Sequence, residues 1–477
     1  MVDLVKEKSL ADQLTAKVEQ RNTEPIAKEC GSQVFKNETA SLRVSKYLRS
    51  IEFDKENYLY HTCLGNPVQV NEDYEDYLDI IREGITLQQM DKFPDLKEQT
   101  KTLIELGLIE YSGSKDFLEE GVERNIAKAV TGELVKLLVI DVSTRCNLAC
   151  SYCNVHKTQE KHNITQTTMS FETARTAVDE FIVLCKKTNR RSAVINYFGG
   201  EPLLNYKMLE SLMRYVASIK SSIKGLEISH GISTNAVLLT DDRIETIKSL
   251  DVVVSVSLDG LETENDANRK FTNGLGSYAY VEKSLRGLVK ANVPTQVVTT
   301  VSKQNADSLK EFIDYMCEIG IKELSIKSTI YRDVPADERR RISVAIKEGI
   351  AYARSKGVSA LNGPGELNYT RGCQGLGEML CVEPNGEVFA CPEGIRTKLG
   401  DADALSDIPN SKEYQHIASR ITGNIEACRG CDVEGLCRGG CAGESDYNFD
   451  DIFQVNRSAC ESIRENIKRG LVEMARA

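Results

Sequence analysis

Apolar and polar segments alternate regularly in the middle of this chain. Between residues 135 and 335, short runs rich in β-branched residues are each followed by a segment whose apolar residues recur at helical spacing. Six such repeats predict an α/β fold, a parallel sheet with helices outside it that curls into a partial (β/α)6 barrel. Right-handed crossovers would place functional residues at the carboxyl ends of the strands. The predicted strands are 137–142, 193–198, 226–232, 252–258, 295–301 and 324–327, and the predicted helices are 171–187, 206–222, 241–250, 277–291, 305–319 and 337–355.

A smaller pattern precedes the barrel. Residues 1–49 are polar and predict a loosely held leader or arm. Two β-type runs around the turn signal at 65–67 predict a hairpin, and two amphipathic segments and a short strand follow it. We therefore expect a winged-helix-like domain at 50–115 and a charged linker at 116–134, before the barrel at 135–335.

The last part of the chain lacks a regular period. Residues 336–477 begin with a bridging helical segment, continue as a region rich in Gly and Cys, and close with a helical pattern at about 456–475. Long apolar runs are too few there for an ordinary core. Bound metal would have to supply stability, so we expect a C-terminal Cys-rich, metal-binding domain.

Composition and charge narrow the classes of protein. The chain has 477 residues, with 60 Lys+Arg against 71 Asp+Glu and a formal net charge of −11, so we expect neither nucleic acid nor a membrane as partner. The N-terminus is charged where a signal peptide is apolar, and no stretch approaches about 18 uninterrupted apolar residues, which predicts a cytoplasmic protein. In a reducing compartment, 15 cysteines indicate metal binding rather than disulfides.

Three cysteines stand close together directly after the first predicted strand. Cys146, Cys150 and Cys153 occur in the sequence Cys-Asn-Leu-Ala-Cys-Ser-Tyr-Cys. Three thiolates on a short loop can hold three irons of a [4Fe–4S] cluster and leave the fourth iron open for catalysis. A zinc loop is the alternative, although structural zinc sites favour a second Cys pair at ribbon distance, which this loop lacks.

This loop resembles the cysteine motif of the radical S-adenosylmethionine (SAM) enzymes, and the resemblance extends through the barrel. It implies a partial TIM-like barrel whose first cluster binds SAM, with Tyr152 facing the adenine. Residues 197–204, Tyr-Phe-Gly-Gly-Glu-Pro-Leu-Leu, resemble the motif that holds the SAM amino group, because glycines admit close backbone approach and Glu201 can accept from an ammonium. Arg269 resembles the family's arginine for the SAM carboxylate and offers a bidentate fork. For Ser233, Asn235 and Ser257, which end predicted strands, capping of the strand is the alternative role. The implied SAM contacts are Tyr152, Gly199, Gly200, Glu201, Pro202, Ser233, Asn235, Ser257 and Arg269.

Eight further cysteines form a second group, which resembles the SPASM extension of radical SAM enzymes. The resemblance assigns an inner set, Cys373, Cys381, Cys391 and Cys441, and an outer set, Cys428, Cys431, Cys437 and Cys460. Eight thiolates suffice for two more [4Fe–4S] clusters, so the expected cofactors are three [4Fe–4S] clusters and SAM. Two zinc sites of four cysteines each are the alternative, since zinc also uses pairs of cysteines two residues apart.

A general acid or base is harder to place. Sulfatase-maturing relatives carry an aspartate immediately after the inner-set cysteine that corresponds to Cys391, whereas this chain has Pro392-Glu393 there. We take Glu393 as the candidate catalytic base, with a surface carboxylate as the alternative. His156 and His162 follow the first cysteine loop and are expected to be solvated. The cysteines expected outside the clusters are Cys30, Cys63, Cys185 and Cys317, the last two in the core.

The resemblance implies a function. Winged-helix-like elements on radical SAM peptide maturases bind the leader of a precursor as an added strand, so residues 50–115 are expected to bind a ribosomally made precursor peptide. Reductive cleavage of SAM would give a 5′-deoxyadenosyl radical that abstracts hydrogen from the peptide and leads to a thioether, as in sactisynthase- or ranthipeptide-type enzymes, or to another crosslink. Flavodoxin or ferredoxin is the expected electron donor. The alternatives are radical oxidation of a protein side chain or small metabolite, and a non-catalytic Fe–S or zinc scaffold; for residues 50–115, dimerisation or a DNA-type wing is the alternative.

Overall fold

The computed structural model describes residues 38–328, 334–361 and 372–476. Their contacts divide the chain into two units. The larger unit comprises 123–421 and 440–456, and the smaller comprises the first 122 residues with 422–439 and 457–477. Residues 336–477, expected as one domain, are therefore shared between the two units. The expected arm falls mostly on residues outside the described ranges.

A mostly parallel sheet forms the centre of the larger unit. Ten strands lie in the order β12-β11-β10-β9-β8-β7-β6-β13-β14-β15. All six predicted strands are confirmed, and β13 adds a parallel neighbour on the other side of β6. The arrangement is consistent with a partial radical SAM barrel. The strands are β6 (Leu137–Ser143), β7 (Ser192–Gly199), β8 (Glu227–Thr234), β9 (Val253–Ser257), β10 (Thr295–Val301), β11 (Glu323–Ser328), β12 (Ser359–Leu361), β13 (Met379–Val382), β14 (Glu387–Phe389) and β15 (Gly400–Asp401).

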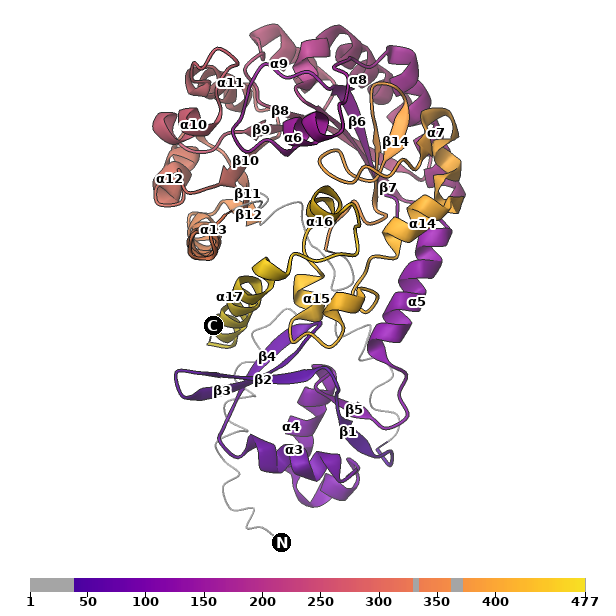
Figure 1. The fold of residues 1–477 in the computed structure, drawn as a ribbon, viewed down its shortest axis with the longest axis vertical. Coiled ribbons are helices and arrows are strands. Elements are labelled where there is room, and N and C mark those ends of the chain that lie inside the picture. The colour runs from indigo at the N-terminus through magenta and orange to yellow at the C-terminus, as the bar shows by residue number, and fades with distance from the viewer. Residues whose placement is uncertain (1–37, 329–333, 362–371, 477) are drawn as a thin grey trace. The chain divides into compact units, whose positions relative to one another are not determined.

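Helices cross between successive strands of this sheet and lie outside it (Figure 1). All six predicted helices are present. Two short helices, α6 (Asn154–Lys161) and α10 (Glu262–Asn268), were not expected because they are too short and polar to show an apolar period. None of the helices in the described ranges is long and apolar enough to cross a membrane. The predicted helices are α7 (Phe171–Lys187), α8 (Tyr206–Lys220), α9 (Asp241–Ser249), α11 (Tyr278–Lys290), α12 (Leu309–Ile319) and α13 (Ala336–Ser355).

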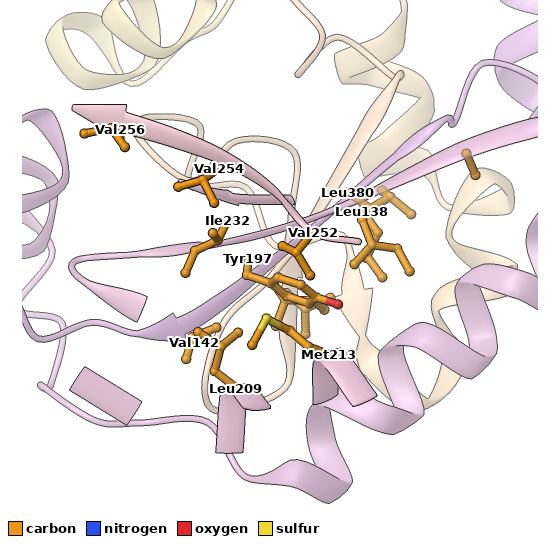
Figure 2. Close-up of a cluster of buried hydrophobic side chains, with 14 of the residues drawn as sticks. Leu138, Val142, Tyr197, Leu209, Met213, Ile232, Val252, Val254, Val256 and Leu380 are labelled. Atoms are coloured by element: carbon orange, nitrogen blue, oxygen red, sulfur yellow. The ribbon is translucent and has the colours of Figure 1, made fainter. Parts of the chain in front are cut away.

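The two faces of the central strands differ. In β7 every second side chain is buried, and Figure 2 shows Tyr197 among apolar side chains that include Leu209 and Met213 of α8. The opposite face is partly open, since Val194 and Val253 remain 42% and 41% exposed. Side chains alternate along a strand, so this second face presents one row of residues at the carboxyl ends of β7, β8 and β9.

The smaller unit contains two small antiparallel sheets. The expected hairpin is present as β3 (Glu56–His61) and β4 (Gly65–Val70), but its turn lies at 62–64, and residues 65–67, expected as the turn, begin β4. β2 (Leu48–Phe53) pairs with the other edge of β3. The second sheet pairs β1 (Leu42–Val44) with β5 (Ile109–Tyr111). The helices of this unit are α3 (Tyr74–Arg82), α4 (Pro94–Glu105), the short α15 (Glu434–Cys437) and the C-terminal α17 (Arg457–Arg476).

The span expected as a linker, 116–134, contains a helix, α5 (Phe117–Val130). Leu118 and Ala129 on this helix are buried. The charged residues of this span hide a narrow stripe of apolar residues along one face of the helix. Burial of that stripe stabilises the helix.

Candidate functional site

The loop after β6 carries the first cysteine set. Burial raises the pKa of Cys146 to about 12 and that of Cys150 to about 11, and it raises the pKa of Cys153 as well. The backbone fixes the loop, since the N–H of Ala149 donates to the carbonyl of Lys270 at 2.7 Å. A buried thiol deprotonates where a positive charge, such as a bound metal ion, compensates the thiolate, so this donor set fits an iron–sulfur cluster.

Gly199 and Gly200 bring the end of β7 against the cysteine loop. Gly199 has φ +139°, and a Cβ there would lie 2.4 Å from Oδ1 of Asp141 and 2.5 Å from the carbonyl oxygen of Ser143. A Cβ at Gly200 would lie 2.5 Å from the carbonyl oxygen of Arg145. These contacts require glycine for packing against the loop itself, in addition to the ligand approach expected from the sequence.

Glu201 ties two strand ends together. Its side chain is 0% exposed, and burial raises its pKa. Oε1 accepts from the hydroxyl of Thr234 at 2.7 Å and from the N–H of Leu203 at 3.0 Å, and Oε2 accepts from the N–H of Asn235 at 2.8 Å. Because a carboxylate has about four acceptor positions, it retains capacity for one further donor. Pro202 begins the short helix that follows, Pro202–Asn205.

Asn235 links the end of β8 to the cysteine loop. Its Nδ2 donates to Oδ1 of Asn147 at 2.8 Å and lies 3.9 Å from Sγ of Cys146. Ser233, on the partly open face, exchanges hydrogen bonds with Asn196 of β7. Ser257 is the last residue of β9 and is half-buried. The structure thus brings Asn235 into contact with the cysteine loop, whereas it pairs Ser233 with Asn196.

Tyr152, the residue expected to face the adenine, contacts a buried ion pair between Arg269 and Asp259. Nε of Arg269 donates to Oδ2 of Asp259 at 2.7 Å, and the hydroxyl of Tyr152 donates to the same carboxylate. Burial opposes the charge of Arg269, but Asp259 raises its pKa well above the ordinary value. Asp259 is 0% exposed and also accepts from the N–H of Thr300 at 2.9 Å.

Sequence reasoning did not assign a role to Asp259. The guanidinium expected to bind a ligand carboxylate already has this protein carboxylate as a partner. The signal that marks Asp259 is its place in Ser257-Leu-Asp-Gly260, directly after β9. Carboxyl ends of parallel strands collect functional side chains, so an ionisable residue there merits the same attention as the arginine.

The inner cysteine set includes two residues on the side of β6 where β13 pairs with it. Cys381 lies on β13, and Cys391 follows β14. A Cβ built at Gly375 would lie 3.5 Å from Sγ of Cys373 and 3.6 Å from Cβ of Cys391, so these two cysteines flank one glycine. Burial and then Cys441 raise the pKa of Cys373 to about 11. Cys441 comes near as well, because Gly394, three residues after Cys391, packs on Gly443, two residues after Cys441: a Cβ at Gly394 would lie 2.8 Å from Cα of Gly443.

Glu393 lies between the first and the inner cysteine sets. Its backbone carbonyl accepts from the hydroxyl of Thr158, on α6, at 2.8 Å. After burial, its charge contributes to the raised pKa of Cys153 and to those of Cys391 and Cys441. Its backbone N–H donates to Sγ of Cys391 at 3.4 Å, and α6 begins directly after Cys153, so the Glu393 backbone connects the segments that carry the two sets.

The outer cysteine set lies in the smaller unit. Cys428, Cys431 and Cys437 occupy a short stretch of turns and helical segments that includes α15, and Cys460 lies on α17, which contacts α15. In the ranges that the structure describes, no group of three or more His, Cys, Asp and Glu side chains is placed to hold a single metal ion. A four-iron cluster instead distributes its cysteine ligands over separate irons.

The remaining candidates lie outside these sets. His156 is on α6, and His162 follows that helix. Cys185 is buried in the core and Cys317 packs against it, as expected. Cys63 is buried in the smaller unit, and Cys30 lies outside the described residues.

Comparison with known families identifies the class of protein. Residues 140–316 match the radical SAM superfamily, and residues 373–432 match the SPASM iron–sulfur cluster-binding domain. The chain is therefore a radical SAM enzyme with a SPASM domain.

Relatives of this class include peptide-modifying enzymes. The radical SAM cyclopropyl synthase TigE of Paramaledivibacter caminithermalis is 26% identical over 90% of this chain and 95% of its own. Two solved structures share the fold. Native anSMEcpe with bound AdoMet and Cp18Cys peptide has a TM-score of 0.58 at 21% identity, over 72% of this chain and 99% of that one. Streptococcus suis SuiB bound to precursor peptide SuiA has a TM-score of 0.52 at 17% identity, over 88% and 100%.

Proposed function

We propose that this chain is a radical SAM peptide maturase that abstracts hydrogen from a ribosomally synthesised precursor peptide and joins parts of it through a thioether or another crosslink. The position of Glu393 carries the proposal. Its backbone N–H donates to Sγ of Cys391 at 3.4 Å, and its carbonyl accepts from Thr158 on α6, the helix that begins directly after Cys153, so its segment lies against the loops that carry both sets. A crosslink needs hydrogen abstraction at one place and removal of an electron and a proton nearby, which this arrangement supports.

When bound, SAM and three [4Fe–4S] clusters would supply the 5′-deoxyadenosyl radical and the route for electrons. The first, inner and outer cysteine sets would hold the clusters. Around SAM, Glu201 would accept from the amino group with its remaining lone-pair position, and Tyr152 would lie against the adenine. Arg269, oriented by Asp259, would present its other N–H groups to the SAM carboxylate.

Glu393 is the proposed proton acceptor. As a carbon–sulfur bond forms, the substrate thiol loses its proton, and a carboxylate beside the thiols can take it. The hydrogen bond from Thr158 to the Glu393 backbone fixes the segment that carries this side chain.

The proposed partner of residues 50–115 is the leader of the precursor, bound to a winged-helix-like element. SuiB, which shares the fold over most of this chain, is known bound to its precursor peptide. In the described part of the chain, β2 pairs only with β3, and α17 contacts β4. The outer edge of β2 is therefore the proposed site for an added strand. Flavodoxin or ferredoxin is the proposed electron donor.

Product analysis tests the function. Anaerobically reconstituted enzyme, SAM, a reductant and the peptide encoded beside the gene should yield 5′-deoxyadenosine and a peptide lighter by two hydrogen atoms. Glu393→Gln should slow peptide conversion more than SAM cleavage. Tandem mass spectrometry would locate the crosslink. Cleavage of SAM with no change in any such peptide would contradict the proposal and favour oxidation of another substrate.

Substitutions in β2 test leader binding. Successive N–H groups of a strand point to opposite sides, so proline at Ser50 or at Ile51 removes a hydrogen-bond donor from one side each. One variant should weaken leader binding while retaining the hairpin, and the other should disturb the pairing with β3. Fluorescence anisotropy with labelled leader and circular dichroism distinguish them. Unchanged leader affinity in both folded variants would contradict this site.

A further inference from the structure

The smaller unit buries a tyrosine hydroxyl that lacks a partner. Tyr60 lies on β3 and is 0% exposed. Its Oη atom has no hydrogen-bond partner among the residues that the structure describes. Buried hydroxyl groups are almost always hydrogen-bonded, since losing water without replacement is costly. The orphaned hydroxyl therefore indicates a group that completes the site.

The neighbours of Tyr60 show where the hydroxyl lies. Tyr58, two residues earlier on the same face of β3, packs against Val472 and Ala475 of α17, whereas Leu59 packs into the apolar core of the other face. Burial and then the charges of Asp432 and Cys431 raise the pKa of Tyr60. Tyr60 shares the face of Tyr58 that packs against α17, the helix that carries Cys460, so the phenol lies on the face of the sheet nearest the outer cysteine set.

The polar groups around the phenol are engaged elsewhere. Asp432 accepts from Nε of Arg464 at 2.7 Å and from Nη2 at 2.9 Å, and it pairs with Lys468. As a thiol, Cys431 donates to Asp432 at 3.6 Å. As an iron ligand it would have no proton, and its sulfur would become an acceptor in need of a donor.

The backbone holds these parts together within the unit. The N–H of Gly435, between two outer-set cysteines, donates to the carbonyl of Thr62 at 3.1 Å. A Cβ at Gly435 would lie 2.5 Å from Cα of Cys63. The end of β3 and the outer cysteine segment are therefore in direct contact.

We propose that Tyr60 donates its hydroxyl hydrogen to a sulfur of the cluster held by the outer set. The inference rests on the proposed ligand set of Cys428, Cys431, Cys437 and Cys460. Hydrogen bonds to cluster sulfur stabilise the more negative, reduced state, so Tyr60 raises the reduction potential of this cluster. Tyr60 is a positioning residue, and it links the sheet proposed to bind the leader to a redox centre.

The test compares two tyrosines of one strand. Tyr60→Phe removes the proposed donor. Tyr58→Phe is the matched control, because the Tyr58 hydroxyl already donates to Glu56 at 2.5 Å and accepts from Arg476 at 2.9 Å. The holoenzyme variants are reconstituted anaerobically, their iron is counted, and the outer cluster is titrated by electron paramagnetic resonance, its signal assigned through its loss in Cys437→Ala. Exchangeable protons coupled to the cluster are counted by electron–nuclear double resonance in H2O and D2O.

We expect Tyr60→Phe to retain iron, to shift the midpoint potential of the outer cluster to a more negative value and to lose one coupled exchangeable proton, while Tyr58→Phe changes neither. An unchanged potential and proton count in Tyr60→Phe would overturn the proposal and indicate a buried water as the partner. Wild-type protein with ring-deuterated tyrosine supplies a second measurement that needs no variant: absence of deuterium coupling to the outer cluster would also overturn it. About eight rather than about 12 irons in wild type would overturn it through the ligand set itself.

Discussion

The inner and outer cysteine sets are built on different kinds of structure. The inner set depends on the large sheet: Cys381 is 1% exposed on β13, which pairs with β6 along four residues. The outer set lies on turns, on the short α15 and on one turn of α17. Sheet hydrogen bonds and the apolar core place Cys381 without metal, whereas we expect the outer segments to depend on metal and a few polar contacts for their order.

Polar contacts in the two regions differ in the same way. In the larger unit, Asp259 and Arg269 form a pair whose side chains are 0% and 9% exposed. In the smaller unit, Arg464 reaches Asp432 with 48% of its side chain exposed. Water screens the second pair, so it orients a segment more than it stabilises it.

The largest expected effect separates the first set from the outer set. Cys150→Ala should abolish SAM cleavage because it removes a ligand of the cluster that binds SAM. Cys437→Ala should retain some SAM cleavage without peptide product, since the outer set lies in the other unit. Production of 5′-deoxyadenosine by chromatography measures both, with Cys317→Ala as a control outside the sets. Full cleavage by Cys150→Ala would contradict the assignment.

Removal of iron should disorder one set more than the other. After anaerobic chelation, amides of residues 422–439 should lose their protection from hydrogen exchange, because few buried apolar contacts hold that segment. Amides of β13 should remain protected by its ladder with β6. Exchange followed by mass spectrometry measures the two together. Equal loss in both segments would show that metal organises the inner set as well.

Breaking the charge pair of the larger unit should cost more than breaking that of the smaller one. Asp259→Asn leaves Arg269 buried without a counter-charge and should destabilise the larger unit by about 3–5 kcal/mol. Asp432→Asn should cost about 1 kcal/mol or less. Denaturant unfolding followed by segment-resolved exchange measures each effect. Equal costs would mean that Asp432 is less screened than its partner's exposure indicates.

A smaller, pH-dependent effect should appear around His61 in the smaller unit. Burial lowers the pKa of His61 from 6.5 to about 4, and its Nδ1 accepts from the N–H of Cys63 at 3.1 Å. Between these values the unfolded chain binds more protons than the folded one, so stability falls as the pH falls. The loss between pH 6.5 and 5 should be about 1.5 kcal/mol.

Hydrogen exchange of residues 61–64 at both pH values measures the loss. His61→Asn should remove the pH dependence, whereas substitution of His416 should leave it. A dependence that persists in His61→Asn would assign it to another group.

The sequence by itself determined the repeating strands and helices, and its motifs indicated the class of chemistry through the family they resemble. The strands follow from local periodicity: β6 to β11 occur at the predicted runs because each run is apolar enough to bury. The motif of Glu201 predicts an acceptor for SAM, whereas the donors that Glu201 has in the structure, Thr234 and Asn235 among them, come from a distant segment.

Only the tertiary structure decided which groups meet. It paired Arg269 with Asp259, placed α5 where charge suggested a linker, and connected the backbone of Glu393 to Cys391 and to α6. It also divided the cysteine-rich region between two units and brought the end of β3 against the outer cysteine segment. Such contacts join residues far apart in the chain, and whether a polar group is buried with a partner depends on the whole packed fold rather than on its neighbours in sequence.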